Sequence, residues 1–192
     1  MSYVMVDVEL DGPIPGDFSM ICIGAVIVEA ALSRTFYGKL RPISERWVPE
    51  ALAISGFSRE DTVAFDNPCD VMACFERWIK ENTNGRPIMI SDNAGYDWQF
   101  VNWYFHHFLG RNPLGYSAVD LGSLYKGVAR DMFTSFKHLV KTPHTHNPVD
   151  DATGNAEALL SMKAELGLRI SLKNSRACRK IGFGSKVVRY EK

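Results

Sequence analysis

The segment Tyr3–Glu9, with the sequence Tyr-Val-Met-Val-Asp-Val-Glu, determines the expected fold. Its alternating valines indicate a strand, in which side chains point to the two faces in turn. Asp7 and Glu9 therefore point to one side and the valines point to the other, into a core. Two carboxylates at the end of an apolar strand repel each other, and the pair is tolerated if it shares a proton or if it binds a cation, for which a hard divalent ion such as Mg²⁺ is the natural partner. The alternative interpretation is a solvated strand end that carries two acids.

The composition is that of an ordinary globular domain. Of the 192 residues, 46% are hydrophobic and 23% are charged, so we expect one domain with a sizeable core. The net charge is zero, which gives no general indication of a polyanion-binding protein. However, Arg169–Lys192 holds eight basic residues and one acid. We therefore expect an enzyme domain over residues 1–168 and a basic extension over residues 169–192, which either contacts phosphates or is a solvated terminus.

The cysteines form no metal-binding pattern. Among Cys22, Cys69, Cys74 and Cys178 there is no Cys-x-x-Cys pair and no zinc-ligand spacing. Cys22 in a strand and Cys74 in a helix occupy apolar positions, so we expect buried or free thiols in a reducing compartment. No signal peptide and no long apolar span is visible, so the expected location is the cytoplasm, without a membrane partner.

Hydrophobic patterning predicts strands first and alternating helices and strands afterwards. Strands over 19–29 and 34–40 follow the first strand at hairpin distance, so they are expected to be antiparallel. Residues 41–62 are expected to be irregular. This order predicts an α/β fold in which a mixed sheet of five or six strands is flanked by helices. The remaining expected elements are a helix over 67–81, a buried strand over 87–91, an aromatic-rich helix over 96–109, a strand over 116–121, two helical pieces within 122–139 and a helix over 148–167.

Further acids are expected at the starts of two helices. Asp97 falls in the first turn of the aromatic-rich helix, and Asp150 and Asp151 fall in the first turn of the final helix. The partial positive charge of a helix start favours an ionised carboxylate, which alone would explain such acids, and we assign Asp150 to that role. His146 lies on the loop before the cap residue Asn147. An imidazole there can accept a proton from a water molecule, and the alternative is a surface histidine.

Three segments together resemble the motifs of the DEDDh 3′–5′ exonucleases. They are Asp7-Val8-Glu9, the Asn-x-x-x-Asp segment from Asn93 to Asp97, and the His-x-x-x-x-Asp-Ala segment from His146 to Ala152. Segments 20–26 and 54–58 look like the family's second strand and the short segment before its first helix. The resemblance extends over roughly residues 4–166.

Spacing favours the histidine subtype of that family. His146 stands five residues before an aspartate that is followed by alanine, whereas His144 stands at that distance from neither aspartate. Tyrosine-type relatives carry tyrosine four residues before the last aspartate, where this chain has Asn147. Pro148 departs from the family, whose members often have alanine there, but proline suits the first position of a helix.

The resemblance implies a ribonuclease-H-like fold and a metal-dependent 3′–5′ exonuclease. Such an enzyme hydrolyses single-stranded RNA or DNA from the 3′ end to nucleoside 5′-monophosphates. Asp7, Glu9, Asp97 and Asp151 would hold two Mg²⁺ or Mn²⁺ ions, with His146 as the general base. Small relatives act as homodimers, so a homodimer is expected. The alternatives are a nucleic-acid-binding domain without catalysis and a hydrolase of very short oligonucleotides.

Candidate substrate contacts lie close to these motifs in the sequence. Leu10 follows Glu9 and would wedge beside the terminal base, as the equivalent residue tends to do in the family. Asn93 begins the second motif. Lys137 and Lys141 precede His146 and either contact phosphates or are solvated. Nothing in the sequence places a donor near a terminal 2′-hydroxyl, so RNA and DNA stay equal candidates.

Three aromatic residues of the 96–109 helix are further candidates. Tyr96, Trp98 or Phe100 would stack on bases of a single strand. Core packing is the competing role for an aromatic residue on a helix, and we expect it for Phe100 above all. Trp98 is therefore the preferred candidate for contact with substrate.

Overall fold

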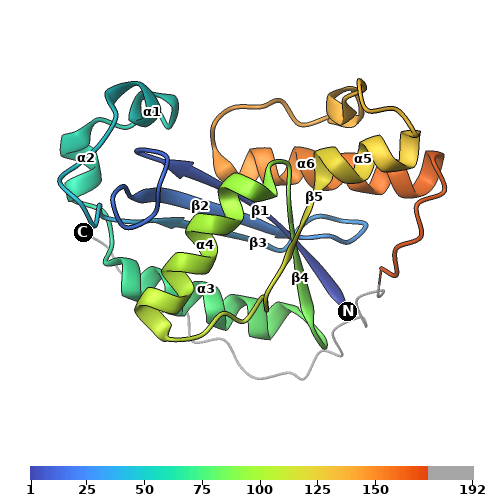
Figure 1. The fold of residues 1–192 in the computed structure, drawn as a ribbon. Helices are drawn as coiled ribbons and strands as arrows, with labels where there is room; N and C mark the ends of the chain where they lie inside the picture. Colours follow the sequence, from blue (N-terminus) through green and yellow to red (C-terminus); the bar gives the residue numbers. More distant parts are fainter. Residues whose placement is uncertain (173–192) are drawn as a thin grey trace, which may run out of the picture.

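The structure, a computed structural model, describes residues 1–172, so residues 173–192 and the expectations for them lie outside the described part. A mixed five-stranded sheet forms its centre, with strand order β3-β2-β1-β4-β5 (Figure 1). Antiparallel pairing joins β3, β2 and β1, and parallel pairing joins β1, β4 and β5. The predicted mixed sheet is therefore confirmed. The strands are β1 (Ser2–Leu10), β2 (Met20–Ile27), β3 (Thr35–Lys39), β4 (Pro87–Ser91) and β5 (Ala118–Asp120).

Helices cover both faces of this sheet (Figure 1). Helices α3 and α4 pack on one face, and α6 packs with α5 on the other. All of the helices that the sequence predicts over 67–167 are confirmed, with ends shifted by a few residues. The helices are α1 (Pro49–Ile54), α2 (Arg59–Val63), α3 (Pro68–Asn82), α4 (Ala94–Leu109), α5 (Leu121–Ala129), the 3₁₀ helix η1 (Phe136–Leu139) and α6 (Pro148–Glu165).

The central strand β1 contributes to the hydrophobic core on both faces. Val4, Val6 and Val8 pack with the α3 and α4 side chains, as predicted. Met5 points the other way and is fully buried in the core beneath α5 and α6. Burial of each such side chain contributes about 1.5–3 kcal/mol, so the strand is held firmly at the middle of the molecule.

The expectation of irregular structure over residues 41–62 is wrong, because two short helices form there. Pro49 occupies the first turn of α1, where backbone N–H groups have no partner within the helix, so a proline loses no helical hydrogen bond there. Helix α2 begins with a capping box, in which Ser58 and Asp61 bond each other's backbone N–H groups. Both helices are too short for a hydrophobic periodicity to indicate them.

A buried ion pair holds α2 against the end of β1. The carboxylate of Asp11 is fully buried and accepts hydrogen bonds from the Ser19 N–H and from Arg59 Nη1, the latter at 2.9 Å. Arg59 also donates to the Ser44 carbonyl. The α1–α2 segment is thereby fixed beside the strand end that carries Asp7 and Glu9.

The expectation for one cysteine is wrong. Cys74 is exposed on α3, because Met72 and Phe75 take up the side of the helix that faces the core. Cys22 is fully buried in β2, as predicted. Cys22, Cys69 and Cys74 are free thiols, as expected, within the part of the chain that the structure describes.

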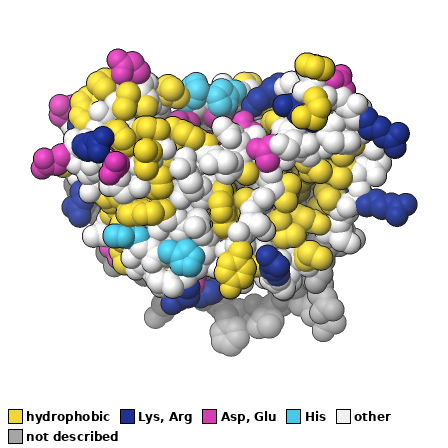
Figure 2. All heavy atoms as spheres, in the orientation of Figure 1, with side chains coloured by type: hydrophobic (Ala, Val, Ile, Leu, Met, Phe, Trp, Pro, Cys, Tyr) yellow, Lys and Arg dark blue, Asp and Glu magenta, His cyan; other side chains and the backbone are white. Residues whose placement is uncertain are grey.

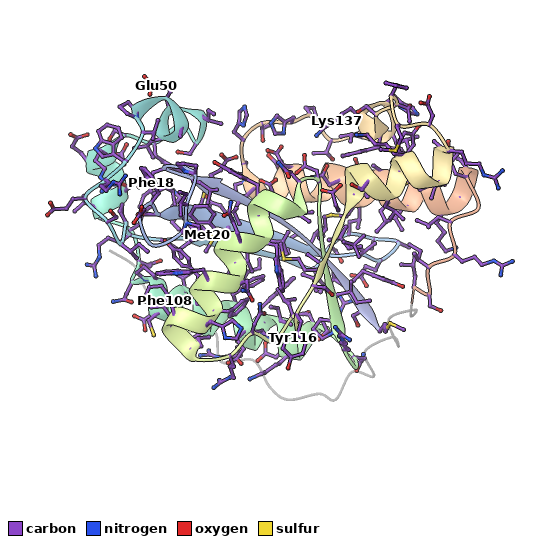
Figure 3. All side chains as sticks on the ribbon, in the orientation of Figure 1. Phe18, Met20, Glu50, Phe108, Tyr116 and Lys137 are labelled. Carbon is purple, nitrogen blue, oxygen red and sulfur yellow. The ribbon has the colours of Figure 1, made fainter. Side chains whose placement is uncertain are left out.

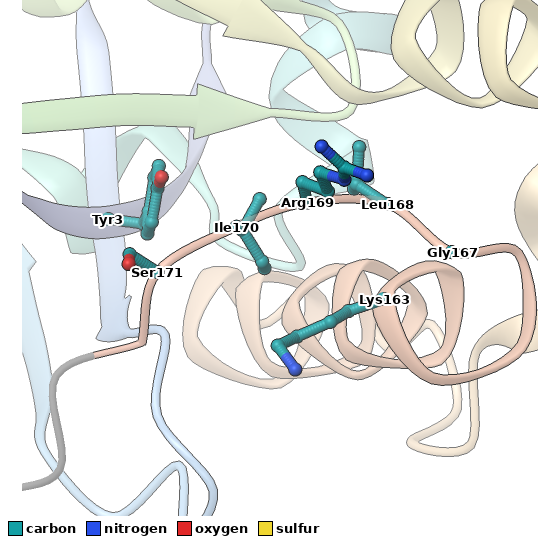
Figure 4. A pocket seen from close by; sticks show the side chains of 7 residues that line it. All are labelled: Tyr3, Lys163, Gly167, Leu168, Arg169, Ile170 and Ser171. Atoms are coloured by element: carbon teal, nitrogen blue, oxygen red, sulfur yellow. The ribbon is translucent and has the colours of Figure 1, made fainter.

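The segment after α6 turns back along the domain and lines a shallow hollow with Tyr3 and Lys163 (Figure 4). Leu168, Ile170 and Leu172 pack against the core beneath α6, so the first residues past the predicted boundary at 168 lie on the domain surface. Tyr3 is at the start of β1, and the acidic residues are at its other end. None of the helices within residues 1–172 has the length and apolar character that crossing a membrane requires.

Candidate active site

Strand β1 brings Asp7 and Glu9 to the face of the sheet that α6 covers. Antiparallel pairing places Asp7 opposite Gly24 of β2, and Glu9 opposite Cys22. The two acidic residues are 9% and 8% exposed, although they lie at the end of an otherwise apolar strand. The alternative of a solvated strand end is therefore excluded for both residues.

Gly24 allows the start of α6 to approach the sheet at this point. A Cβ atom added to Gly24 would lie 2.2 Å from the carbonyl carbon of Pro148 and 2.4 Å from the backbone nitrogen of Val149. Since Gly24 pairs with Asp7, this close crossing puts the first turn of α6 beside that carboxylate. This role of Gly24 is not among the predictions from the sequence, although a glycine inside an apolar strand is a signal of close backbone approach.

The first turn of α6 supplies Asp151, which is 5% exposed. Its Oδ1 accepts a hydrogen bond from the Thr145 N–H at 3.0 Å, and its Oδ2 accepts one from the His146 N–H at 3.1 Å. Asp150 is more exposed and accepts a bond from Thr145 Oγ1 at 3.0 Å. This geometry agrees with the assignment of Asp150 to the helix end and of Asp151 to the acidic site.

Asp7, Glu9 and Asp151 form one cluster. Each offers a carboxylate oxygen, and the three oxygens lie within 4.8 Å of one another. Within residues 1–172, no lysine or arginine forms an ion pair with any of the three. Hard divalent cations such as Mg²⁺ and Mn²⁺ prefer carboxylate oxygens, so this donor set fits such an ion.

Asp97 lies in the first turn of α4, as predicted, and is 5% exposed. Its Oδ2 atom is buried and has no hydrogen-bond partner among the described residues. An unpartnered buried carboxylate oxygen is costly unless a cation binds it. After burial, the charge of Asp97 makes the largest contribution to the raised pKa of Asp7. The structure thus brings Asp7, Glu9 and Asp151 within 4.8 Å of one another, and Asp97 is a buried neighbour whose charge acts on Asp7.

Asp120, at the end of β5, fixes the start of the helix that carries Asp97. Its Oδ2 accepts a hydrogen bond from the Ala94 N–H at 3.0 Å, and its Oδ1 accepts one from the Ser123 N–H at 2.6 Å. One carboxylate thus joins the N-termini of α4 and α5. Burial raises the pKa of Asp120, but these hydrogen bonds outweigh it and the net shift is downward. Asp120 is not among the residues predicted from the sequence, where its signal is an aspartate at the cap position of a short helix.

Burial and mutual repulsion raise the pKa values of three of the clustered acids. Burial raises the pKa of Glu9 to about 7, and the charge of Asp151 adds to the shift. Burial raises the pKa of Asp97 to about 8, with contributions from Asp92 and Glu9. The pKa of Asp7 is also raised well above its ordinary value, first by burial and then by Asp97 and Glu9. A bound cation would reverse these shifts, because it stabilises the charged forms.

Two histidines cover the cluster from the loop before α6. His146 has a left-handed backbone with φ of 60°, and its Nδ1 lies 3.8 Å from Glu9 Oε1. His144 Nδ1 lies 2.9 Å from Asp151 Oδ2, and the ring centroids of the two histidines are 4.3 Å apart. Figure 2 shows histidine side chains beside acidic ones at the upper edge, where the outline dips between two lobes. The predicted base therefore lies at the site, together with a second histidine.

Lys137 and Asn93 lie on the rim of the site. Lys137 Nζ pairs with Asp92 Oδ2 at 3.0 Å, and Figure 3 places it at the upper edge of the molecule. Asn93 is exposed and precedes α4, where its carbonyl accepts hydrogen bonds from the Tyr96 and Asp97 N–H groups. Lys141 lies farther along the chain, bonds Glu157 through its backbone and lines a hollow along α6.

The apolar candidates differ in exposure. Phe100 is fully buried, so its expected role in the core is confirmed. Leu10 is 6% exposed and packs in the core on the α4 side. Tyr96 is 40% exposed and Trp98 is partly buried, so these two remain open to a ligand.

Comparisons with known proteins agree with this geometry. No protein-family profile matches the chain. The 3′–5′ DNA exonuclease Cap18 of Escherichia coli is 38% identical over 165 residues, which cover 81% of this chain and 88% of that protein. The chain belongs to the DEDDh 3′–5′ exonuclease family.

Solved structures of DEDDh exonucleases share its ribonuclease-H-like fold. The nuclease domain of 3′hExo, bound to rAMP, has a TM-score of 0.69 at 15% identity over 90% of this chain and 97% of that one. Cell-death related nuclease 4 has a TM-score of 0.69 at 12% identity, over 85% of this chain and 64% of that one. E. coli exonuclease I in complex with a dT13 oligonucleotide has a TM-score of 0.69 at 13% identity, over 86% of this chain and 42% of that one.

Membership of the DEDDh family implies dependence on a divalent metal ion. The residues of this chain fit that requirement, because three carboxylates converge and a fourth has an unpartnered buried oxygen. All four groups are carboxylates, which suits a hard cation. The family comparison and the chemistry of the donor set therefore lead to the same class of cofactor.

Proposed function

We propose that this chain removes nucleoside 5′-monophosphates from the 3′ end of single-stranded DNA. The convergence of Asp7, Glu9 and Asp151 within 4.8 Å, without an ion pair to any lysine or arginine of residues 1–172, is the observation that carries the proposal. DNA is the proposed substrate because the E. coli relative at 38% identity is named a DNA exonuclease. The structure of exonuclease I, which shares the fold and is in complex with a dT13 oligonucleotide, supports a single strand as the form of the substrate.

The proposed cofactor is a pair of Mg²⁺ or Mn²⁺ ions. Asp7, Glu9 and Asp151 would hold one ion, and Asp7 with Asp97 would hold the other. Bound there, the ions supply a water of lowered pKa and neutralise charge on the reacting phosphodiester. The raised pKa values of Asp7, Glu9 and Asp97 support this assignment, because burial and then repulsion by neighbouring carboxylates raise them, and a bound cation would offset both effects.

His146 is the proposed general base. It takes the proton of the attacking water as the phosphodiester bond breaks and the 3′ oxygen of the shortened strand leaves. Its position supports the role, since Nδ1 lies 3.8 Å from Glu9 Oε1 and the side chain is 45% exposed. The left-handed backbone at His146 directs the ring toward the acidic cluster from a loop outside the sheet.

Five residues are proposed to contact the strand. Lys137 and Asn93 are favoured because they lie on the rim of the site. Trp98 is partly exposed on the helix that carries Asp97, where a base can stack on it. Leu10 adjoins Glu9 and is proposed as the wedge beside the terminal base, and Lys141 is proposed to contact phosphates farther from the site.

The oligomeric state and the C-terminal extension complete the proposal. We propose a homodimer of the enzyme domain, residues 1–168, with residues 169–192 as a basic extension that binds phosphates. The excess of basic residues in that extension supports the second point. Sedimentation of the full chain at several concentrations tests the dimer. Binding of DNA by a chain that ends at residue 172, measured against salt, tests the extension.

Digestion of matched single strands tests the proposed reaction. DNA and RNA of one sequence, labelled at the 5′ end, are incubated with Mg²⁺, with Mn²⁺ and with EDTA. The proposal predicts a descending ladder on DNA, release of 5′-monophosphates and no reaction in EDTA. Faster digestion of RNA would overturn the choice of DNA. Activity confined to dimers and trimers would favour a hydrolase of very short oligonucleotides, and binding without cleavage would favour an inactive binding domain.

A further inference from the structure

A second group of metal-ligating side chains adjoins the carboxylate cluster. His144, His146 and Asp151 each offer one ligand atom, and these atoms lie within 4.8 Å of one another. His144 Nδ1 is 2.9 Å from Asp151 Oδ2, and the histidine ring centroids are 4.3 Å apart at an interplanar angle of 72°. Both histidines are exposed, so an ion can reach them from solvent.

The donor set of this group differs from that of the carboxylate cluster. Two imidazole nitrogens and one carboxylate oxygen are typical ligands of Zn²⁺, which takes three protein ligands and a water in open sites. Mg²⁺ demands oxygen ligands and gains little from imidazole. The two groups share Asp151, and the second also includes His146, the proposed general base. Occupation of one group therefore interferes with the use of the other.

The local backbone holds the second group together. The N–H groups of Thr145 and His146 both bond the Asp151 carboxylate, so the loop is tied to its third ligand. The left-handed conformation of His146 turns the loop there, and the two rings remain in edge-to-face contact. The three ligand atoms lie within 4.8 Å of one another. Zinc holds such ligands at about 2.0–2.2 Å, so the exposed rings must rotate toward a shared ion when it binds.

We propose that His144, His146 and Asp151 form a zinc site that inhibits this exonuclease. A bound Zn²⁺ occupies the nitrogen that would accept the proton and a carboxylate that would hold Mg²⁺. The inhibitory effect rests on the proposed function, whereas zinc binding itself does not. His144 has no assigned role in the proposed reaction, so its replacement separates zinc binding from the reaction itself.

Calorimetric titration with Zn²⁺ tests binding without any need for activity. The full-length chain and its Asp7→Asn variant are titrated without Mg²⁺, because Mg²⁺ bound by Asp151 would compete with zinc for that shared ligand. Co²⁺ absorption reports nitrogen ligation. The proposal predicts that one zinc ion binds per chain. The His144→Ala variant should lose zinc affinity by roughly tenfold or more, because a three-ligand site loses one ligand. The Asp7→Asn variant should still bind zinc. Equal zinc affinity in wild type and His144→Ala would overturn the site, provided that circular dichroism shows both to be folded. His144→Gln gives a second variant if the alanine variant does not fold.

Inhibition is then measured on the same proteins with labelled single-stranded DNA. We expect zinc to stop Mg²⁺-dependent digestion by the wild type. With each protein's rate in zinc expressed relative to its own rate in Mg²⁺ alone, the His144→Ala variant should require roughly tenfold more zinc to be stopped. Equal inhibition of both would assign the effect to the carboxylate cluster and contradict the proposal. If the wild type digests nothing, the proposed function fails, while the calorimetric result still decides the zinc site.

Discussion

Glu9 and Glu76 are two covered glutamates with opposite electrostatics. Their side chains are 11% and 9% exposed. Glu76, on α3, accepts bonds of 2.7 Å from Arg111 Nε and Nη2 and pairs with Lys80 at 2.9 Å. The Arg111 hydrogen bonds lower the pKa of Glu76 to about 2, whereas burial and the charge of Asp151 raise that of Glu9 to about 7.

The difference separates a structural acid from one that is available for a cation. Arg111 and Lys80 supply Glu76 with all of its compensating charge, so nothing further is needed from solution. Among residues 1–172, Glu9 approaches His146 but no lysine or arginine, and it shares its surroundings with Asp7 and Asp151. A folded protein tolerates such a cluster because a dication completes it.

Asp7→Asn should have the largest effect, because it removes the carboxylate that is proposed to touch both ions. We expect loss of Mg²⁺-dependent digestion by roughly 10³-fold or more, as a metal supplies several kcal/mol of transition-state stabilisation. Glu76→Gln is the matched control and should digest DNA at the wild-type rate. Release of labelled mononucleotides measures both. Substantial turnover by a folded Asp7→Asn protein would remove the distinction between the two kinds of acid.

His146→Ala should reduce the rate by about 10²–10⁴-fold, which is the usual contribution of a general base. Its metal affinity should change little, because the cluster supplies its carboxylates without His146. His144→Ala is the matched control from the same loop. Rates in saturating Mg²⁺ and the Mn²⁺ affinity are the two measurements. A loss of only a few-fold in His146→Ala would instead indicate His144 or solvent as the base.

Gly24→Ala should destabilise the protein and displace Asp151. The new Cβ would overlap the backbone of Pro148, so the start of α6 must shift. We expect a loss of about 3 kcal/mol in the free energy of unfolding, the upper end for overpacking, and weaker Mn²⁺ binding. Gly127→Ala is the control, since nothing lies within 4 Å of its added Cβ. Urea unfolding and metal titration measure the two effects, and wild-type values for both in Gly24→Ala would contradict this account of α6.

The smallest effect is a pH dependence of stability in EDTA. Glu9 binds a proton more tightly in the folded state, where its pKa is about 7, than at the ordinary value of 4.5. It therefore lowers stability as pH rises from 4.5 to 7, by about 2–3 kcal/mol, and Glu9→Gln should flatten that decline. Glu76, with a pKa of about 2, stabilises above pH 4.5 and loses this as pH falls toward 2. Urea unfolding across pH tests both, and a steeper decline in Glu9→Gln would reverse the assigned sign.

Most of the fold is predictable from the sequence because its signals are local. The alternation of acids and valines in β1 fixes both faces of the central strand, and Asn147 with Pro148 marks the start of α6. Helices α1 and α2 escape prediction because they are shorter than two turns. The exposure of Cys74 depends on which side of α3 faces the sheet. The spacing of the apolar residues defines that side only to within one residue.

The acids of the site are also predictable, but the reasons for their convergence are not. Asp97 and Asp151 are recognisable at helix starts, yet their approach to β1 depends on contacts between distant segments. Gly24 lets α6 approach the sheet at Asp7, and Asp120 fixes the start of α4. The partnership of His144 with Asp151 depends likewise on the shape of the loop before α6. A glycine inside a strand and an aspartate at a helix cap are recognisable in the sequence, but the distant segments that they bring together are not.

The most direct test is a crystal of the full chain soaked in Mn²⁺, with anomalous scattering recorded for manganese. The account predicts two peaks bounded by Asp7, Glu9, Asp97 and Asp151, both absent in Asp7→Asn, and no peak at Glu76. A cluster without manganese at saturating concentration, or manganese bound by the histidines alone, would contradict the claim that these carboxylates are left unpaired to hold two dications.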